Sequence, residues 1–134
     1  MKVISALCLL LASGACFAET PQQILQAYTI KAAGEQAGYT ASGKRGENFF
    51  HQHFAVNSKM PACASCHTDK PLNAGQHAIT GKSIRPMAVA ANVGRFTDPA
   101  KVEKWFGRNC KEVVGRACTP AEKADFVAYM LEVR

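Results

Sequence analysis

The sequence predicts an all-α domain of four to five helices joined by long loops. A capping residue precedes a proline at three places, Thr20-Pro21, Asp98-Pro99 and Thr119-Pro120, and this pairing commonly begins a helix. Apolar residues then recur three and four positions apart, which is the period of a helix. No strand–helix–strand pattern is visible along the chain.

The first predicted helix carries an apolar stripe of Ile24, Ala27, Tyr28 and Ala32, and the last one carries Phe126, Val127, Met130 and Val133. A further helix is expected from Arg45 to Phe54. Gly46 lies one turn before Phe49 in it, where a glycine costs about 1 kcal/mol relative to alanine. Such a glycine would let another helix cross closely, with Tyr129 of the last helix as its neighbour. Fraying at the glycine is the alternative.

Two cysteines three positions apart, Cys63 and Cys66, precede His67 directly. This spacing is typical of a c-type haem attachment site, because two thiols one helical turn apart can each form a thioether with one vinyl group of a porphyrin. His67 would then bind the iron as the proximal ligand. A redox disulfide would need a βαβ context, and a zinc site would need a second Cys/His pair; neither is visible. The predicted cofactor is one covalent haem c.

The helix that begins after Asp98 becomes informative once haem is expected. Its apolar positions are Val102, Trp105, Phe106 and Val113, and Asn109 falls on the same face. An amide buried without a partner costs roughly 1–3 kcal/mol, so a partner is required. From the pattern alone, Asn109 either binds the iron or bonds the backbone as a cap at the helix end.

Residues 1–18 have the features of a secretory signal peptide. A positive start precedes an apolar run from Val3 to Leu11, which is too short to span a bilayer, and small residues continue to Ala18. Cleavage is therefore predicted after Ala18. A lipoprotein with Cys16 acylated is the weaker alternative, because Ser13 stands where such signals carry a large aliphatic residue.

The mature chain, residues 19–134, has the size of one small domain, with an N-terminal helix extension over 19–43 and a haem-binding core over 44–134. Of six cysteines, two leave with the signal and two bind haem. The remaining two, Cys110 and Cys118, can pair in an oxidising compartment. Their disulfide would close a loop of about nine residues and stabilise the fold by about 2–3 kcal/mol.

The charge balance indicates an acidic partner. Without Lys2 the chain has 15 Lys and Arg against 10 Asp and Glu, a formal +5, which two haem propionates would reduce to about +3. The charges are scattered, and the expected compartment is the periplasm, so nucleic acid is not predicted. A periplasmic redox partner is expected, since complementary charge speeds encounter. No further run is long enough for a transmembrane helix.

An irregular stretch from 69 to about 92 is suited to wrapping a flat cofactor. Lys82 and Arg85 are candidates to pair with the haem propionates, and exposure as plain surface charges is the equal alternative. Met87 follows a proline, as in many Met-ligated cytochromes, and is an alternative sixth ligand. His77 is a second alternative, and it would give a low-spin ferrous state that refuses CO.

Several blocks of this sequence occur in the order and spacing of a known family. They are Cys63-Ala-Ser-Cys-His-Thr68, Thr80-Gly-Lys-Ser-Ile84, Arg95-Phe-Thr-Asp98, Lys101-Val-Glu-Lys-Trp105, Gly107-Arg-Asn-Cys110 and Gly115-Arg-Ala-Cys-Thr-Pro-Ala-Glu-Lys123. They resemble the branch of class I c-type cytochromes that holds the sphaeroides haem protein and cytochrome c double-prime. The resemblance covers about residues 44 to 133 and implies the class I cytochrome c fold.

The resemblance also implies a ligand set. In the sphaeroides haem protein the sixth iron ligand is the asparagine directly before the first disulfide cysteine, which maps onto Asn109 with Cys110–Cys118 as the disulfide. Cytochrome c double-prime has a histidine at that place, so this chain is closer to the former. The family implies that the distal ligand leaves when the iron is reduced, which would open the iron to O₂, NO or CO.

The chemistry of iron agrees with that implication, because an amide oxygen suits hard ferric iron better than softer ferrous iron. Trp105 and Phe106, one turn before Asn109, are expected to line the haem pocket. The expected function is an electron carrier that binds diatomic gases, rather than an enzyme, with another c-type cytochrome as partner. Alternatives are a Met-ligated electron carrier, a haem enzyme turning over NO or peroxide, which would need a distal acid–base group, and a sensor acting through a separate partner.

Overall fold

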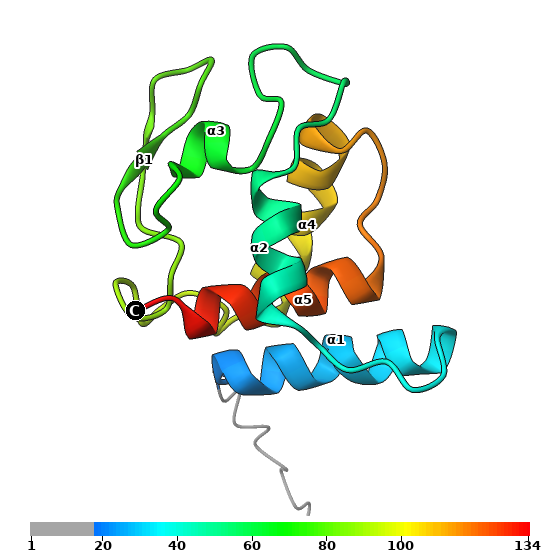
Figure 1. Ribbon diagram of the computed structural model, residues 1–134. Coiled ribbons are helices and arrows are strands. Elements are labelled where there is room, and N and C mark those ends of the chain that lie inside the picture. Colours follow the sequence, from blue (N-terminus) through cyan, green and yellow to red (C-terminus); the bar gives the residue numbers. More distant parts are fainter. Residues whose placement is uncertain (1–17) are drawn as a thin grey trace, which may run out of the picture.

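The computed structural model describes residues 18–134. Residues 1–17 of the predicted signal peptide, with the alternative lipidation site Cys16, lie outside the described residues. The described chain forms five helices and one short two-stranded sheet (Figure 1). In chain order the elements are α1 (Pro21–Glu35), α2 (Gly43–His51), α3 (Ala64–His67), β1 (Gly75–Gln76), β2 (Ser83–Ile84), α4 (Pro99–Val113) and α5 (Pro120–Glu132).

The predicted all-α class is confirmed, and so are the three cap-and-proline helix starts. Thr20 and Thr119 each form a full capping box, in which the threonine side chain accepts from the third helical N–H and that residue's side chain accepts from the cap N–H. Asp98 accepts from the Lys101 N–H at the start of α4. These caps satisfy donors that a helix leaves unpaired at its beginning.

Two local expectations were wrong. Helix α2 spans Gly43–His51 instead of 45–54, because the Ser42 side chain caps it earlier and the chain turns away before Phe54. The Phe54 N–H donates to the Pro61 carbonyl (2.7 Å) instead of continuing the helix. On α1, Ala27 is exposed, although the other three residues of its predicted stripe are buried.

The loop predicted to be irregular contains a short hairpin. Strands β1 and β2 pair antiparallel, with Gly75 opposite Ile84 and Gln76 opposite Ser83. Each strand has only two residues, which is too short for an alternating apolar pattern to develop. The hairpin lies beside α3 at the end of the molecule opposite α1 (Figure 1).

Helices α2 and α5 cross at very short range. A Cβ added to Gly46 would overlap the backbone carbonyl of Asp125 and lie 2.9 Å from the Tyr129 Cβ. The expectation that Gly46 permits a close crossing beside Tyr129 is therefore confirmed. The crossing is reinforced by the buried Asp125 carboxylate, which accepts from the Tyr39 hydroxyl (2.6 Å), the Ser42 N–H (2.7 Å) and Arg45 Nε (2.7 Å). A buried carboxylate needs such donors.

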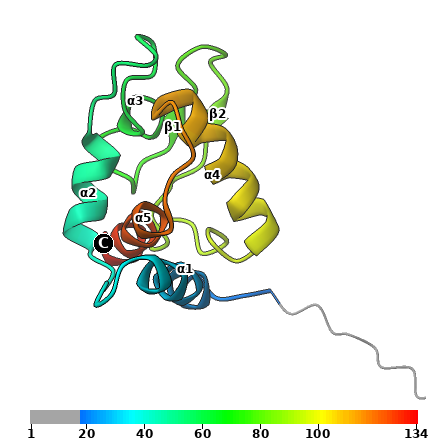
Figure 2. The same cartoon turned by 90° about the vertical axis from the view of Figure 1, so that its right-hand side faces the viewer.

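Helix α4 is placed differently from α1 and α2, which both pack closely on α5. It stands to one side of the molecule (Figure 2) and is joined to the core by side chains. Phe106 packs edge-on against Tyr28 (ring centroids 5.7 Å apart) and Phe126 (5.5 Å). The Tyr28 hydroxyl donates to Glu103 on the same helix (2.7 Å). The helix is thus held at its middle without close backbone contact.

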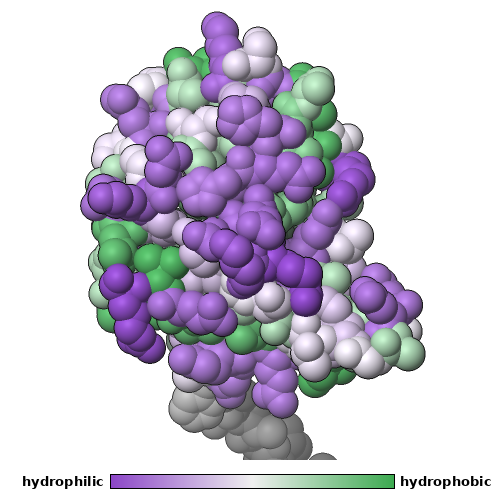
Figure 3. Space-filling model, viewed as in Figure 1, coloured by the Kyte–Doolittle hydropathy of each residue, from purple (hydrophilic) through white to green (hydrophobic). Residues whose placement is uncertain are grey.

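Hydrophilic side chains dominate the face shown in Figure 3, which is the face seen in Figure 1. Among residues 18–134, no helix has the length and apolar content needed to cross a membrane.

Replacing Gly46 with alanine should lower the free energy of unfolding by about 1–3 kcal/mol, because the new methyl group forces α2 and α5 apart. Gly34 on α1 is the matched control, since nothing lies within 4 Å of the Cβ position there. Gly34→Ala should leave stability unchanged or raise it by up to about 1 kcal/mol. Denaturant unfolding measures both. Equal effects at the two sites would contradict the close crossing.

Candidate haem site

The Cys-x-x-Cys-His motif forms the single turn of α3. Cys63 is the residue before the helix, and its carbonyl accepts from the Cys66 N–H (3.3 Å) and the His67 N–H (3.2 Å). Both thiols are partly buried and form no disulfide. Burial raises the pKa of the Cys63 thiol to about 11, so it is a neutral thiol at pH 7. The turn therefore presents two unpaired thiols one helical turn apart.

The hairpin fixes this turn from the outside. The Ala78 N–H donates to Cys66 Sγ (3.3 Å). Strand β1 approaches α3 so closely that a Cβ on Gly75 would overlap the Cys66 carbonyl oxygen. Only glycine fits at that position, so the short sheet serves to position the motif.

His67 is held in a form able to bind a metal. Burial, with the positive charge of Arg95 as a second cause, lowers the pKa of His67 to about 4. The imidazole is therefore neutral at pH 7, which is the ligating form. Its ring lies 6.5 Å from the ring of Phe50, which in turn lies 6.0 Å from Phe126. This aromatic row joins His67 to the crossing of α2 and α5.

Asn109 lies within α4, directly before Cys110, and is partly buried. The capping alternative is wrong, because α4 continues to Val113 and ends at Val114. No hydrogen-bond partner of the Asn109 amide is found in the described part of the chain, residues 18–134. The amide remains available for another ligand.

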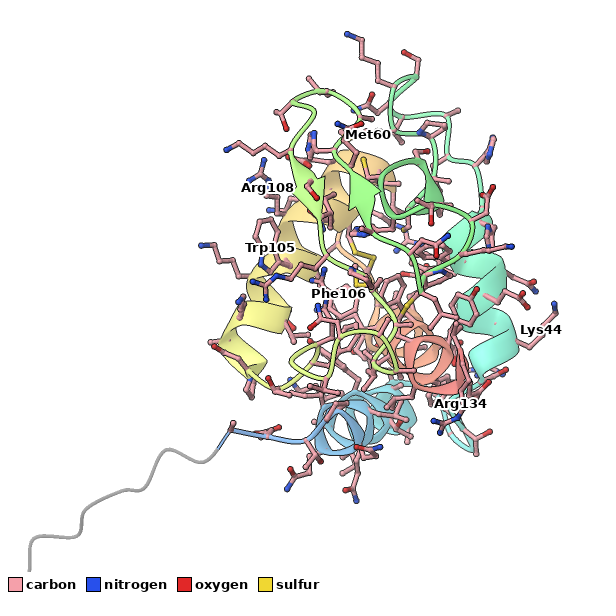
Figure 4. The ribbon with its side chains drawn as sticks, turned by 90° about the vertical axis from the view of Figure 1, so that its left-hand side faces the viewer. Lys44, Met60, Trp105, Phe106, Arg108 and Arg134 are labelled. Atoms are coloured by element: carbon pink, nitrogen blue, oxygen red, sulfur yellow. A yellow bond between two sulfur atoms is a disulfide. The ribbon has the colours of Figure 1, made fainter. Side chains whose placement is uncertain are left out.

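The two aromatic residues before Asn109 differ in their surroundings. Phe106 points into the interior and fills the core beside Phe126, whereas Trp105 is 44% exposed (Figure 4). The Arg108 guanidinium lies 5.8 Å from the Trp105 ring centre. Trp105 is one turn from Asn109 on the same helix, so the exposed indole and the free amide belong to neighbouring positions on α4.

A disulfide joins Cys110 to Cys118, with their Cα atoms 5.7 Å apart. The Cys110 carbonyl also accepts from the N–H groups of Val114 (2.8 Å) and Gly115 (3.0 Å). Gly115 has φ +83°, a conformation that favours glycine. The hydrogen bonds therefore close the end of α4 that carries Asn109, and the disulfide ties this end to the residue just before the Thr119 cap of α5.

The two alternative ligands occupy different environments. Met87 is 8% exposed and packs in the core, and its N–H donates to the Pro71 carbonyl (2.9 Å). The His77 Nδ1 accepts from the N–H groups of Ile79 and Thr80 (3.2 Å each), so the imidazole closes the hairpin turn.

The predicted propionate partners, Lys82 and Arg85, are both exposed. Sequence reasoning assigned no role to Arg95, which is partly buried. Its Nε donates to the Pro86 carbonyl (2.9 Å) and its Nη2 to the Arg85 carbonyl (2.6 Å). A guanidinium that bonds carbonyls across a loop leaves no periodic signal in the sequence. The only sequence signal for Arg95 is that it belongs to the block Arg95-Phe-Thr-Asp98, which is shared with the resembling family.

The donor set fits haem c. Two unpaired thiols on one helical turn match the two vinyl groups, and the neutral imidazole of His67 follows directly. The cysteines of the other pair are already joined to each other, so no thiol competes with the motif among the described residues. A helical domain with this motif defines a c-type cytochrome.

Comparison with known proteins agrees with that class. Residues 36–130 match the family described as domain of unknown function DUF1924, and the chain belongs to this family. Cytochrome c'' of Methylophilus methylotrophus is 43% identical over 112 residues, covering 82% of this chain and 78% of that protein. The cytochrome c-type protein SHP of Cereibacter sphaeroides is also 43% identical over 112 residues, covering 83% and 82%.

The fold agrees as well. The structure of oxidised SHP, described as an oxygen-binding cytochrome c, superposes with a TM-score of 0.77 at 41% identity, covering 84% of this chain and 96% of that one. Oxidised cytochrome c'' gives a TM-score of 0.78 at 40% identity, covering 85% and 94%. The predicted resemblance is confirmed, and the protein is a monohaem c-type cytochrome whose cofactor is haem c.

Removal of the disulfide by the pair of changes Cys110→Ser and Cys118→Ser should lower the free energy of unfolding by about 2–3 kcal/mol, because a short loop is no longer closed in the unfolded chain. Denaturant unfolding of the haem-loaded protein measures the loss. A reducing agent should lower the stability of the native protein by a similar amount and should cause no further loss in the double variant. A native protein indifferent to that agent would contradict a stabilising role.

Proposed function

We propose that this chain is an exported, periplasmic carrier of one electron whose distal ligand, Asn109, binds ferric iron and leaves on reduction. The observation that carries the proposal is the Asn109 amide, which is partly buried on α4 and has no hydrogen-bond partner among residues 18–134. A polar group in that position is satisfied by a ligand or by water. The cofactor, when bound, supplies a one-electron redox centre.

The roles follow from the donor atoms. Cys63 and Cys66 would hold the haem through thioethers, and His67 would supply a neutral nitrogen as an iron ligand. Asn109 supplies an amide oxygen, a hard donor that favours the ferric over the ferrous state. With haem bound, Asn109 would therefore dissociate on reduction and leave a position open to O₂, NO or CO. The structure of the relative cytochrome c'' is itself described in terms of haem-ligand detachment.

The surroundings of Asn109 support a ligand that moves alone. Cys110, its neighbour, is fixed by the disulfide, and Phe106 is fixed in the core. A freed Asn109 amide can donate a hydrogen bond to bound O₂, and Trp105, one turn away on α4, can wall that face of the site. The polarity of such a pocket decides how tightly a gas is held.

Export and the redox partner belong to the same proposal. Cleavage after Ala18 leaves a chain that begins at Glu19 and carries a formal charge of +5. A basic surface of this kind favours an acidic partner by increasing the rate of encounter. Another periplasmic c-type cytochrome is the partner that matches a one-electron carrier in that compartment.

Replacing Asn109 with alanine tests the ligand directly. The ferric optical spectrum should change, because the iron loses its sixth protein ligand. The affinity of the ferrous protein for CO should change by less than about twofold, because a side chain that has already left does not compete. Spectra of both oxidation states, with and without CO, provide the measurement.

Met87→Leu is the matched control for that experiment, since leucine fills a buried site of similar volume. It should leave the ferric spectrum unchanged. An altered ferric spectrum in this variant, together with a native spectrum in Asn109→Ala, would instead assign the sixth ligand to Met87.

A further inference from the structure

Two arginines beside the haem motif lack an acidic partner. Within residues 18–134, no carboxylate lies within ion-pairing distance of Arg85 or Arg95. By contrast, three other arginines of the domain, Arg45, Arg108 and Arg116, each pair with an aspartate or glutamate at 3.0 Å or less.

Arg95 is the more constrained of the two. Its Nε donates to the Pro86 carbonyl and its Nη2 to the Arg85 carbonyl. The Asn92 side-chain amide also donates to the Pro86 carbonyl (3.3 Å). These bonds hold the guanidinium in one orientation. No partner of Nη1 is found in the described residues, so the Nη1 edge of the group remains available to an acceptor.

The local electrostatics call for an anion. Burial lowers the pKa of Arg95, and the positive charge of Arg85 lowers it further. A partly buried cation facing a second cation is costly unless a negative group lies between or beside them. The Arg95 charge also lowers the pKa of His67, so Arg95 lies close to the haem motif.

Haem c carries two carboxylates of its own. We propose that Arg95, through Nη1, together with Arg85, binds a haem propionate, and that Arg95 is the fixed member of this pair. A charged N–H donor forms a short, strong hydrogen bond to a carboxylate, and Nη1 is the nitrogen of Arg95 that is free to do so. The assignment replaces Lys82, which is exposed on the hairpin, as the partner of Arg85. It rests on the presence of haem c at Cys63 and Cys66 and not on Asn109 as a ligand.

Haem-loaded variants test the assignment by two readouts, the propionate bending band in resonance Raman spectra and the midpoint reduction potential. In Arg95→Gln the band should shift, because the propionate loses a charged donor. The potential should fall, because a nearby positive charge no longer disfavours ferric iron. Arg95→Lys keeps the charge and should restore most of the potential. Lys31→Gln on α1, at the other end of the molecule (Figure 1), should move neither readout.

A role confined to the loop gives a different result. If Arg95 only held the Pro86 and Arg85 carbonyls, Arg95→Gln and Arg95→Lys would lower stability while both readouts stayed native, and the proposal would be overturned. Arg85→Gln provides a second test if the Arg95 variants do not fold. The Arg85 side chain is exposed, and its replacement retains the backbone carbonyl that Arg95 binds. It should shift the band and lower the potential; native values would overturn the proposal. None of these outcomes alters the CO and ferric spectra that test Asn109.

Discussion

The close crossing of α2 and α5 is the constraint on which the site depends. Gly46 has no side chain, and this brings the α2 backbone onto the Asp125 carbonyl. Phe50, one turn further along α2, is then fully buried against Phe126 and Tyr129. The ring of His67 lies 6.5 Å from that of Phe50. The close crossing permitted by Gly46 thus fixes Phe50, the ring that lies nearest to the predicted proximal ligand His67.

The helices could largely be predicted because their signals are local. The cap-and-proline starts of α1, α4 and α5 involve residues within one turn of each other, so tertiary structure does not override them. The end of α2 could not be predicted. It depends on a hydrogen bond from Phe54 to Pro61, and the apolar pattern continues past the point where the helix stops.

The site likewise contains residues that could be predicted from the sequence and residues that could not. The haem motif is contiguous, so its chemistry can be deduced from three residues. The position of Asn109 within α4 follows from the helical period, although the period alone did not exclude a cap. Arg95 could not be found, because its orientation depends on carbonyls of a loop that has no regular structure. Likewise, the different surroundings of Trp105 and Phe106 depend on where Tyr28 and Phe126 lie.

The way α4 is fixed limits how a ligand on it can leave. Phe106 packs the middle of the helix against the core, Glu103 accepts from the Tyr28 hydroxyl, and Cys110 in the last turn of the helix forms a disulfide. Moving the whole helix would disturb all three contacts, each worth on the order of 1 kcal/mol or more. Rotating the Asn109 side chain disturbs none of them. Under the proposed function, release of Asn109 would therefore be a local rotation of one side chain that leaves the fold intact.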